Sequence, residues 1–145
     1  MFSLMMGRKM TTRILLVDDS EPVRWDLCTV LSLSGDLEIV GEAANGLEAM
    51  RLTESLQPDV VLMDLEMPVM NGYEAARLIK ALCPSCRIIA LTVHGYSEAR
   101  LKAYQSCVDA FLVKGMPVEN IIQTILNKEG SSAFGGIEDR KMGYE

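Results

Sequence analysis

The sequence predicts a single α/β domain in which helices cover both faces of a parallel sheet. Three observations support this prediction. Short apolar runs, such as those at residues 14–17 and 60–63, are typical of strands that are buried on both faces. Segments of helical length separate these runs, as expected for a doubly wound parallel sheet. The most apolar runs also end in polar residues, which predicts a group of polar side chains at one edge of the sheet.

Strands and helices are expected to alternate along the chain. The first helix should begin near Pro22, which suits a first-turn position, with Ser20 or Glu21 accepting hydrogen bonds from free backbone N–H groups. Trp25 lies off its apolar stripe and should be at least partly exposed, either flat on the surface or, with Arg24, in a docking face. The strands are expected at residues 14–17, 37–41, 60–63, 88–91 and 110–113. Five helices are expected: one that begins near residue 22, one that begins at residue 46, and three at residues 73–82, 97–106 and 117–127.

The composition is that of one domain with an ordinary core. The chain has 145 residues, of which 49% are hydrophobic and 23% are charged. Its formal net charge of −6 argues against a general nucleic-acid-binding surface, which needs clustered Lys and Arg. No apolar stretch approaches the ~20 residues of a membrane span, so a cytoplasmic protein is expected. We expect a mobile extension at residues 1–12, a folded domain at 13–128, and a flexible tail or the start of a linker at 129–145.

Polar residues follow four of the predicted strands. Asp18 and Asp19 follow the first strand, Asp64 the third, Thr92 the fourth and Lys114 the fifth. Because the carboxyl ends of parallel strands meet at one edge, three carboxylates, a hydroxyl and an ammonium group are expected to converge there. Taken singly, each has a simpler explanation, such as a helix-capping turn or a solvated surface charge. Their joint placement favours a functional site over these explanations.

The expected group of carboxylates indicates a cation. Two unit charges ~4 Å apart repel by ~4 kcal/mol at an effective dielectric of 20, so Asp18, Asp19 and Asp64 together need a positive partner. Oxygen ligands with room for water suit Mg²⁺ better than zinc. A Mg²⁺ site with a lysine and a threonine opposite is suited to neutralising a phosphoryl group during transfer. Asp64 would be the nucleophile.

The chain resembles the receiver domain of two-component response regulators from about residue 13 to residue 128. The resemblance is carried by residues 14–19, by Asp-Leu-Glu-Met-Pro-Val-Met-Asn-Gly at 64–72, by Leu-Thr at 91–92 and by Phe-Leu-Val-Lys at 111–114. Leu-Thr-Val-His at 91–94 and Leu-Val-Lys-Gly at 112–115 are similar to the LuxR-type branch, whose receivers usually precede a helix-turn-helix DNA-binding domain. The resemblance implies a flavodoxin-like domain with five parallel strands in the order 2-1-3-4-5 and five helices.

The resemblance also implies a function as a phosphorylation-controlled switch. Such a domain takes a phosphoryl group from a sensor histidine kinase or a histidine phosphotransfer protein, with Mg²⁺, and catalyses its own phosphorylation and dephosphorylation. A homodimer is compatible with the family, and DNA would be bound only through an output domain absent from this chain. The implied roles are Mg²⁺ binding by Asp18, Asp19, Asp64 and the backbone carbonyl of Glu66, phosphoryl acceptance by Asp64, phosphoryl contacts by Thr92 and Lys114, and switching by Thr92 and Phe111.

Three residues depart from the family pattern. Gly115 stands where most receivers have a proline after the lysine, so the family's cis-proline peptide does not carry over and the conformation of the Lys114–Gly115 peptide stays open. Val93 is bulkier than the small residue that commonly follows the threonine, which would narrow access to Asp64 and slow loss of the phosphate. Cys107 stands where glycine is common, so the preceding helix is expected to end differently.

Two other function classes stay open at this point. A Mg²⁺-dependent aspartyl phosphatase would need a second acidic group as general acid, and Glu66 is the only candidate near Asp64. A receiver-like binding module would need no phosphate at all. Cys83 and Cys86 could also suggest redox or zinc chemistry, but their place after a helix and the lack of a second ligand pair favour reduced, packed thiols over a regulatory disulfide.

Overall fold

The sheet has the predicted strand order. The computed structural model describes residues 10–93 and 107–127. In these ranges the strands are β1 (Thr12–Val17), β2 (Leu37–Ala43), β3 (Val60–Asp64), β4 (Arg87–Thr92) and β5 (Ala110–Val113). They form one parallel sheet in the order β2-β1-β3-β4-β5. The strand order therefore reverses beside β1, where β2 lies on one side of it and β3 on the other.

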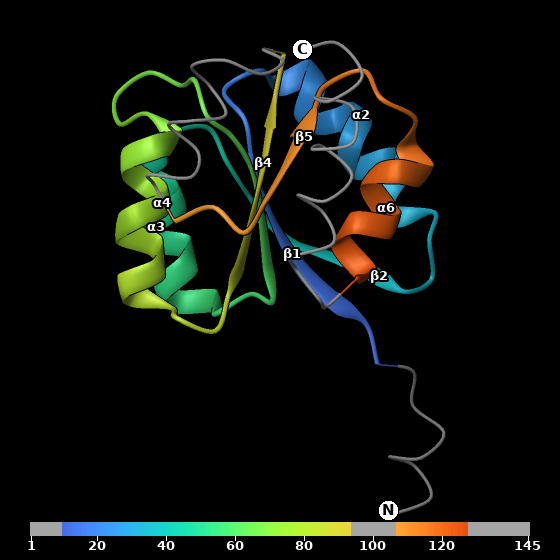
Figure 1. The fold of residues 1–145 in the computed structure, drawn as a ribbon, viewed down its shortest axis with the longest axis horizontal. Coiled ribbons are helices and arrows are strands. Elements are labelled where there is room, and N and C mark those ends of the chain that lie inside the picture. The colour runs from blue at the N-terminus through green and yellow to red at the C-terminus, as the bar shows by residue number, and fades with distance from the viewer. Residues whose placement is uncertain (1–9, 94–106, 128–145) are drawn as a thin grey trace, which may run out of the picture.

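The helices form a layer on each face of the sheet. They are α2 (Glu21–Ser32), α3 (Gly46–Leu56), α4 (Gly72–Leu82) and α6 (Val118–Leu126). Figure 1 shows α3 and α4 on one side of the sheet and α2 and α6 on the other. The fourth predicted helix, at 97–106, lies outside the described residues, as do most of the expected extension and the expected tail. None of the described helices is long and apolar enough to span a membrane.

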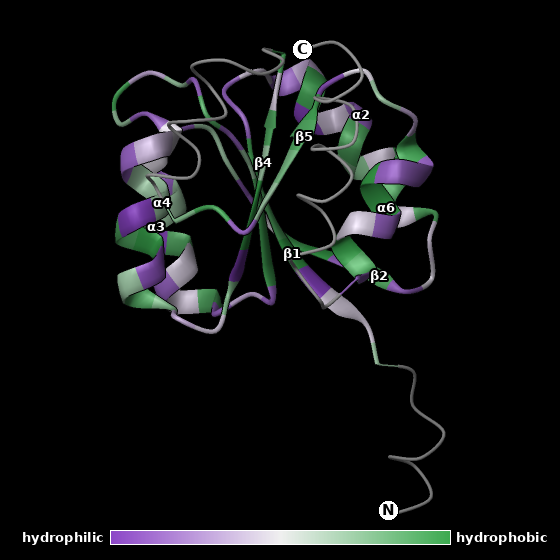
Figure 2. Cartoon of the chain, in the orientation of Figure 1, coloured by the Kyte–Doolittle hydropathy of each residue, from purple (hydrophilic) through white to green (hydrophobic). Residues whose placement is uncertain are grey.

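The apolar runs of the strands supply both halves of the core. Successive side chains of a strand point to opposite faces, so a run of four apolar residues covers both. Leu15 and Val17 of β1 pack in the cluster beneath α3 and α4, whereas Ile14 and Leu16 pack in the cluster beneath α2 and α6. Figure 2 shows these hydrophobic strands between helices that carry hydrophilic residues on their outer faces. The unbroken apolar pattern is thus the signature of a sheet covered on both sides.

Side-chain caps fix where the helices begin. Ser20 accepts a hydrogen bond from the Val23 backbone N–H at 3.3 Å, as predicted for the first helix. Asn45 caps α3 by accepting from the Glu48 N–H at 2.9 Å, and the Glu48 carboxylate accepts from the Ala44 N–H at 2.7 Å. This reciprocal pair satisfies two N–H groups that the helix itself cannot bond. These caps place the N-termini of α2 and α3 at the same edge of the sheet as the predicted site.

Two arginines cap the C-terminal ends of α3 and α6 by donating to backbone oxygens. Arg13 donates to the backbone oxygens of Leu56 and Gln57 at 3.0 and 2.8 Å, at the end of α3. Arg87 donates to the oxygens of Thr124 and Ile125, each at 2.8 Å, at the end of α6. A cation is favourable there because the last carbonyls of a helix are unpaired and carry partial negative charge.

The cysteine pair lies in the core, away from the predicted site. Cys83 and Cys86 are free thiols that are 1% and 0% exposed. Burial raises the pKa of the Cys86 thiol to about 12, with the neighbouring Cys83 as a further cause. Because the thiolate is the reactive species, a thiol with this pKa is chemically inert at neutral pH. The expectation of reduced, packed thiols agrees with this arrangement.

Candidate functional site

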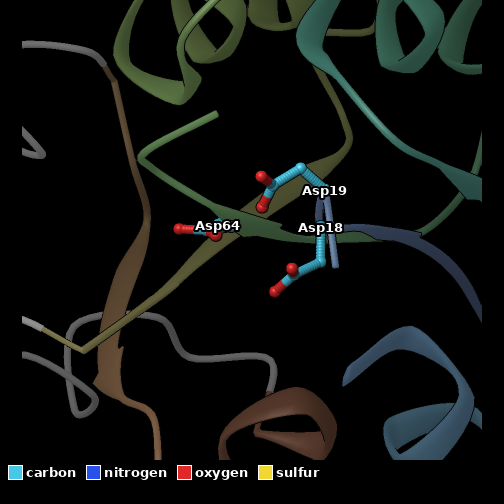
Figure 3. A group of neighbouring side chains, drawn as sticks. All are labelled: Asp18, Asp19 and Asp64. Atoms are coloured by element: carbon cyan, nitrogen blue, oxygen red, sulfur yellow. The ribbon is translucent and has the colours of Figure 1, made fainter. Parts of the chain in front are cut away.

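Three carboxylates meet where the strand order reverses. Asp18 and Asp19 follow β1 directly, and Asp64 is the last residue of the adjacent strand β3. One carboxylate oxygen from each lies within 4.8 Å of the other two. Figure 3 shows the three side chains converging from these two strand ends. Asp18 and Asp64 are buried and Asp19 is exposed, so the cluster opens to solvent on the Asp19 side.

Lys114 links two of these carboxylates. Its Nζ lies 2.7 Å from Asp18 Oδ2 and 3.2 Å from Asp64 Oδ2. The residue follows β5, and its backbone N–H donates to the Thr92 oxygen at 2.6 Å, which continues the pairing of β4 with β5 beyond the strands. Sheet register therefore brings the backbone of Lys114 beside Thr92 and its ammonium group to the carboxylates.

The electrostatics of the site oppose the charge on Asp64. Burial raises the pKa of the Asp64 carboxyl above its ordinary value, and the Asp18 charge raises it further. The hydrogen bond that Asp64 Oδ1 accepts from the Glu66 N–H, at 3.0 Å, and the Lys114 charge act the other way but do not cancel the shift. For Lys114, burial alone would lower the pKa, but the hydrogen bond to Asp18 and the charges of Asp64 and Asp18 leave it raised.

Asp18 is anchored through its backbone as well as its side chain. Its Oδ1 accepts from the Ser20 N–H at 2.9 Å, and its backbone N–H donates to the Ala43 oxygen at 3.0 Å. Its backbone oxygen accepts from Arg24 Nη1 at 2.7 Å. The sequence prediction missed this role of Arg24, which it considered only for a docking face with Trp25. Trp25 is 69% exposed, as expected, whereas Arg24 turns toward β2.

Two glycines allow the loop after Asp64 to pack closely against the first turns of neighbouring helices. The Gly72 N–H donates to the Leu65 oxygen at 2.9 Å, and a Cβ at Gly72 would collide with the backbone of Asp64 and Leu65. A Cβ at Gly46 would meet the Met70 backbone in the same way. The loop between β3 and α4 is therefore packed between the first turns of α3 and α4. Glycine is required at both positions because no side chain fits there.

The remaining predicted residues take defined places around the cluster. Thr92 ends β4 and is buried. Phe111 is buried in the core beneath α3 and α4, on β5, three residues before Lys114. At Glu66 the backbone N–H contacts Asp64, while its side chain is exposed; the expected role of its carbonyl in metal binding stays a prediction. Val93 is 66% exposed and directly follows Thr92.

Two residues that flank β5 have left-handed backbone conformations, as does Val69 in the loop after Asp64, with φ 72°. Gly115 has φ 98° and Cys107 has φ 65°. The described residues contain no cis peptide bond, so the Lys114–Gly115 bond is trans, in line with the absence of the usual proline. Cys107 has the backbone geometry that favours glycine, which is the residue common at this place in the family. The helix that would precede it lies outside the described residues.

The oxygen cluster fits a hard divalent cation. Its ligand atoms are carboxylate oxygens without any His or Cys among them, which is the donor set of Mg²⁺ or Ca²⁺ rather than of structural zinc. The exposed Asp19 leaves room for water molecules, which Mg²⁺ tends to retain. A divalent cation bound there, together with Lys114, would offset the negative charge of the carboxylates and could then accept an anionic group on the open side of Asp64.

The fold and this site define a receiver domain. The family model for the response regulator receiver domain matches residues 14–126, and the chain belongs to this family. Its curated relatives include the nitrate/nitrite response regulator protein NarL of Escherichia coli K12, 34% identical over 120 residues, and the response regulator protein VraR of Staphylococcus aureus, 36% identical over 126 residues. These alignments cover 83% and 86% of this chain but 56% and 60% of the relatives, so the chain spans little more than half of their length.

Solved structures give the same assignment. The signal receiver domain of the putative response regulator NarL from Mycobacterium tuberculosis superposes with a TM-score of 0.75 and 28% identity, covering 82% of this chain and 99% of that one. A DNA-binding response regulator of the LuxR family from Staphylococcus aureus gives a TM-score of 0.74 and 32% identity, covering 79% and 95%. The chain is thus a flavodoxin-like receiver domain whose relatives are LuxR-type response regulators.

Proposed function

We propose that this chain is a phosphorylation-controlled signalling switch that accepts a phosphoryl group on Asp64. The observation that supports this most directly is the position of Lys114, whose Nζ lies between Asp18 and Asp64 at 2.7 and 3.2 Å. The ammonium group is close enough to follow a charge that develops on Asp64. The donor would be the phosphohistidine of a sensor histidine kinase or of a histidine phosphotransfer protein.

The proposed reaction is an in-line transfer onto the Asp64 carboxylate. An Asp64 oxygen attacks phosphorus, a P–O bond forms, and the P–N bond of the donor breaks as the imidazole leaves with its electron pair. The raised pKa of Asp64 reflects a carboxylate that its buried surroundings do not fully compensate, so it favours partners that bring positive charge. When bound, Mg²⁺ supplies charge that neutralises the carboxylates and the phosphoryl oxygens. Asp18, Asp19, Asp64 and the Glu66 carbonyl would hold it.

The signal would leave the site through Thr92, Lys114 and Phe111. Phosphorylation adds charge and acceptor oxygens at Asp64, which the Thr92 hydroxyl and the Lys114 ammonium group can follow. Because the backbones of Thr92 and Lys114 are hydrogen-bonded, movement at one affects the other. Phe111 lies on β5, the strand that leads directly to Lys114. Its ring would change position when Thr92 moves. We expect the resulting surface change at β5, at α6 and at the predicted helix at 97–106, which lies outside the described residues.

The output would be transcription control in the cytoplasm. One solved relative is described as a DNA-binding response regulator of the LuxR family. We infer that this chain is the receiver part of such a regulator, that DNA would be bound by a separate output domain, and that homodimer formation through the receiver would be one response to phosphorylation.

The experiment is intact-mass spectrometry after incubation with Mg²⁺ and acetyl phosphate. We expect one phosphoryl adduct on the wild type, and none on Asp64→Asn or after a chelator has removed the metal. Lys114→Met should slow its formation strongly. Absence of an adduct with acetyl phosphate and with phosphohistidine donors would instead favour a binding module that needs no phosphate.

A second assay separates the switch from a phosphatase. Steady turnover of p-nitrophenyl phosphate over many cycles would favour an aspartyl phosphatase and contradict the proposal. A general acid for that reaction would have to be Glu66, whose side chain is exposed. Glu66→Gln should therefore leave formation of the adduct intact.

A further inference from the structure

Arg24 makes two contacts that join three elements near the acidic cluster. It lies in α2, and its side chain is only 16% exposed although the neighbouring Trp25 is open to solvent. Its Nη1 donates to the Asp18 backbone oxygen at 2.7 Å, and its Nε pairs with Glu42 Oε1 of β2 at 3.1 Å. The planar guanidinium group can serve both acceptors at once, which a lysine ammonium on a flexible stem does less well.

These contacts fix the backbone of Asp18 from both ends. The Asp18 N–H donates to the oxygen of Ala43, the residue that follows Glu42 in β2. The Asp18 oxygen is bonded to Arg24, which is itself anchored on Glu42. Two consecutive residues of β2 thereby determine the orientation of the peptide groups on both sides of Asp18.

The orientation of that peptide group also sets the position of Asp19. The Asp18 carbonyl belongs to the peptide bond that leads into Asp19, so rotation of this group would swing the Asp19 Cα and its carboxylate. Asp19 is the exposed member of the cluster. Mg²⁺ requires near-ideal octahedral geometry, so its affinity depends on how well such ligands are held. Groups that orient metal ligands in this way commonly affect the affinity of a site by 10-fold or more.

We propose that Arg24 is a positioning residue that orients the Asp18–Asp19 peptide group and thereby sets the Mg²⁺ affinity of the site. The inference rests on the proposed function in taking Mg²⁺ as the cation. Arg24 is not among the residues that would hold the metal or the phosphoryl group. It acts through the backbone of Asp18, with Glu42 as its anchor.

Charge and position make opposite predictions for the loss of Arg24. Removing its positive charge leaves Glu42 without its cationic partner and makes the surroundings of the cluster more negative, which by itself tightens binding of a divalent cation. Loss of positioning weakens binding. A fall in affinity in Arg24→Met is therefore not explained by charge. The double variant Arg24→Met/Glu42→Met keeps the net charge of the wild type and isolates the positional effect.

The experiment is calorimetric titration of each purified chain with MgCl₂, with unfolding midpoints measured in metal-free buffer. We expect Mg²⁺ affinity to fall about 10-fold in Arg24→Met and in the double variant. Arg24→Lys, which retains the charge, should lie between these and the wild type. Arg51→Met removes an exposed charge from α3 and should leave the affinity unchanged. Should Arg24→Met fail to fold, the smaller change Arg24→Lys provides the test.

The outcomes separate this inference from the proposed function. Equal or tighter Mg²⁺ binding in folded Arg24 variants would overturn the positioning role and leave the receiver function standing. A wild type that binds no Mg²⁺ would overturn both. Tighter binding in Arg24→Met that returns to the wild-type affinity in the double variant would make Arg24 an electrostatic residue only.

Discussion

At the scale of single residues, the surroundings of Asp64 disfavour the ionised form of its carboxyl group. Its raised pKa means that the native state binds a proton more tightly than the unfolded chain does. Stability then falls as pH rises from the ordinary value of 3.8 through the raised pKa, and above it the ionised carboxylate destabilises the fold. The ionised Asp64 carboxylate is therefore only partly stabilised by Lys114 and the Glu66 N–H.

Removing this charge should stabilise the metal-free protein. We expect Asp64→Asn to raise the free energy of unfolding at neutral pH by on the order of 1 kcal/mol, because the amide keeps the shape of the carboxyl group without its charge. The measurement is urea unfolding in the presence of a chelator. Asp26→Asn, on the exposed face of α2, is the control and should have little effect. A less stable Asp64→Asn would contradict this account of the site.

Cys107 shows strain at a position next to β5. A residue with a Cβ at φ 65° is less stable than glycine there by roughly 1–2 kcal/mol, while glycine loses roughly 0.5–1 kcal/mol through its greater freedom in the unfolded chain. Cys107→Gly should therefore stabilise the protein by about 0.5–1 kcal/mol in urea unfolding. Cys107→Ser keeps the Cβ and should be close to neutral. Equal stability of the two variants would show that the backbone there carries no strain.

At the scale of elements, the loop between β3 and α4 depends on close packing at Gly72. Its Cα faces the backbone of Asp64 and Leu65, so Gly72→Ala must displace either the first turn of α4 or the end of β3. We expect a loss of about 1–3 kcal/mol in stability and slower phosphorylation, because Asp64 itself moves. Thermal unfolding and the rate of adduct formation with acetyl phosphate are the two measurements.

Gly115→Ala is the matched control for this change. Nothing lies within 4 Å of a Cβ at Gly115, so the variant carries only the penalty of its φ of 98°. It should lose stability without the steric displacement at Asp64. If the Gly72→Ala variant is phosphorylated as fast as the wild type, close packing at Gly72 does not position Asp64.

The sequence predicted these elements well where local pattern decides them. Four-residue apolar runs identified β1, β3, β4 and β5 because strands buried on both faces have few alternatives, and Ser20 and Asn45-Gly46 marked helix starts through local capping. Contacts between distant residues were not predictable in the same way. The caps formed by Arg13 and Arg87, and the pairing of Arg24 with Glu42, depend on how far a long side chain reaches after folding.

The site shows the same division. The strand ends predicted which carboxylates meet, because parallel strands bring their carboxyl ends to one edge. The sequence did not reveal that Lys114 bridges Asp18 and Asp64 directly, or that the Glu66 N–H bonds Asp64. These depend on side-chain rotamers and loop geometry, which have no signal in residue spacing.

At the scale of the whole molecule, Mg²⁺ should stabilise the fold by binding the native state only. A concentration about 100 times the dissociation constant stabilises a protein by about 2.7 kcal/mol, so the unfolding midpoint should rise in MgCl₂ at neutral pH. This rise should begin to fall on acidification before ordinary carboxylates titrate, because burial raises the pKa of Asp64. Scans across pH with MgCl₂ and with chelator test this. Asp18→Asn should lose most of the rise, and an equal rise in that variant would place the metal elsewhere.

The most direct test of the central claim is to locate the phosphoryl group chemically. Borohydride reduces an aspartyl phosphate to homoserine, so phosphorylated protein can be reduced, digested and mapped by peptide mass spectrometry. The account predicts homoserine at position 64, only after incubation with Mg²⁺ and a phosphodonor, and none in a chelator-treated sample. Homoserine at another aspartate, or an acid-stable adduct on a serine, threonine or tyrosine, would contradict it.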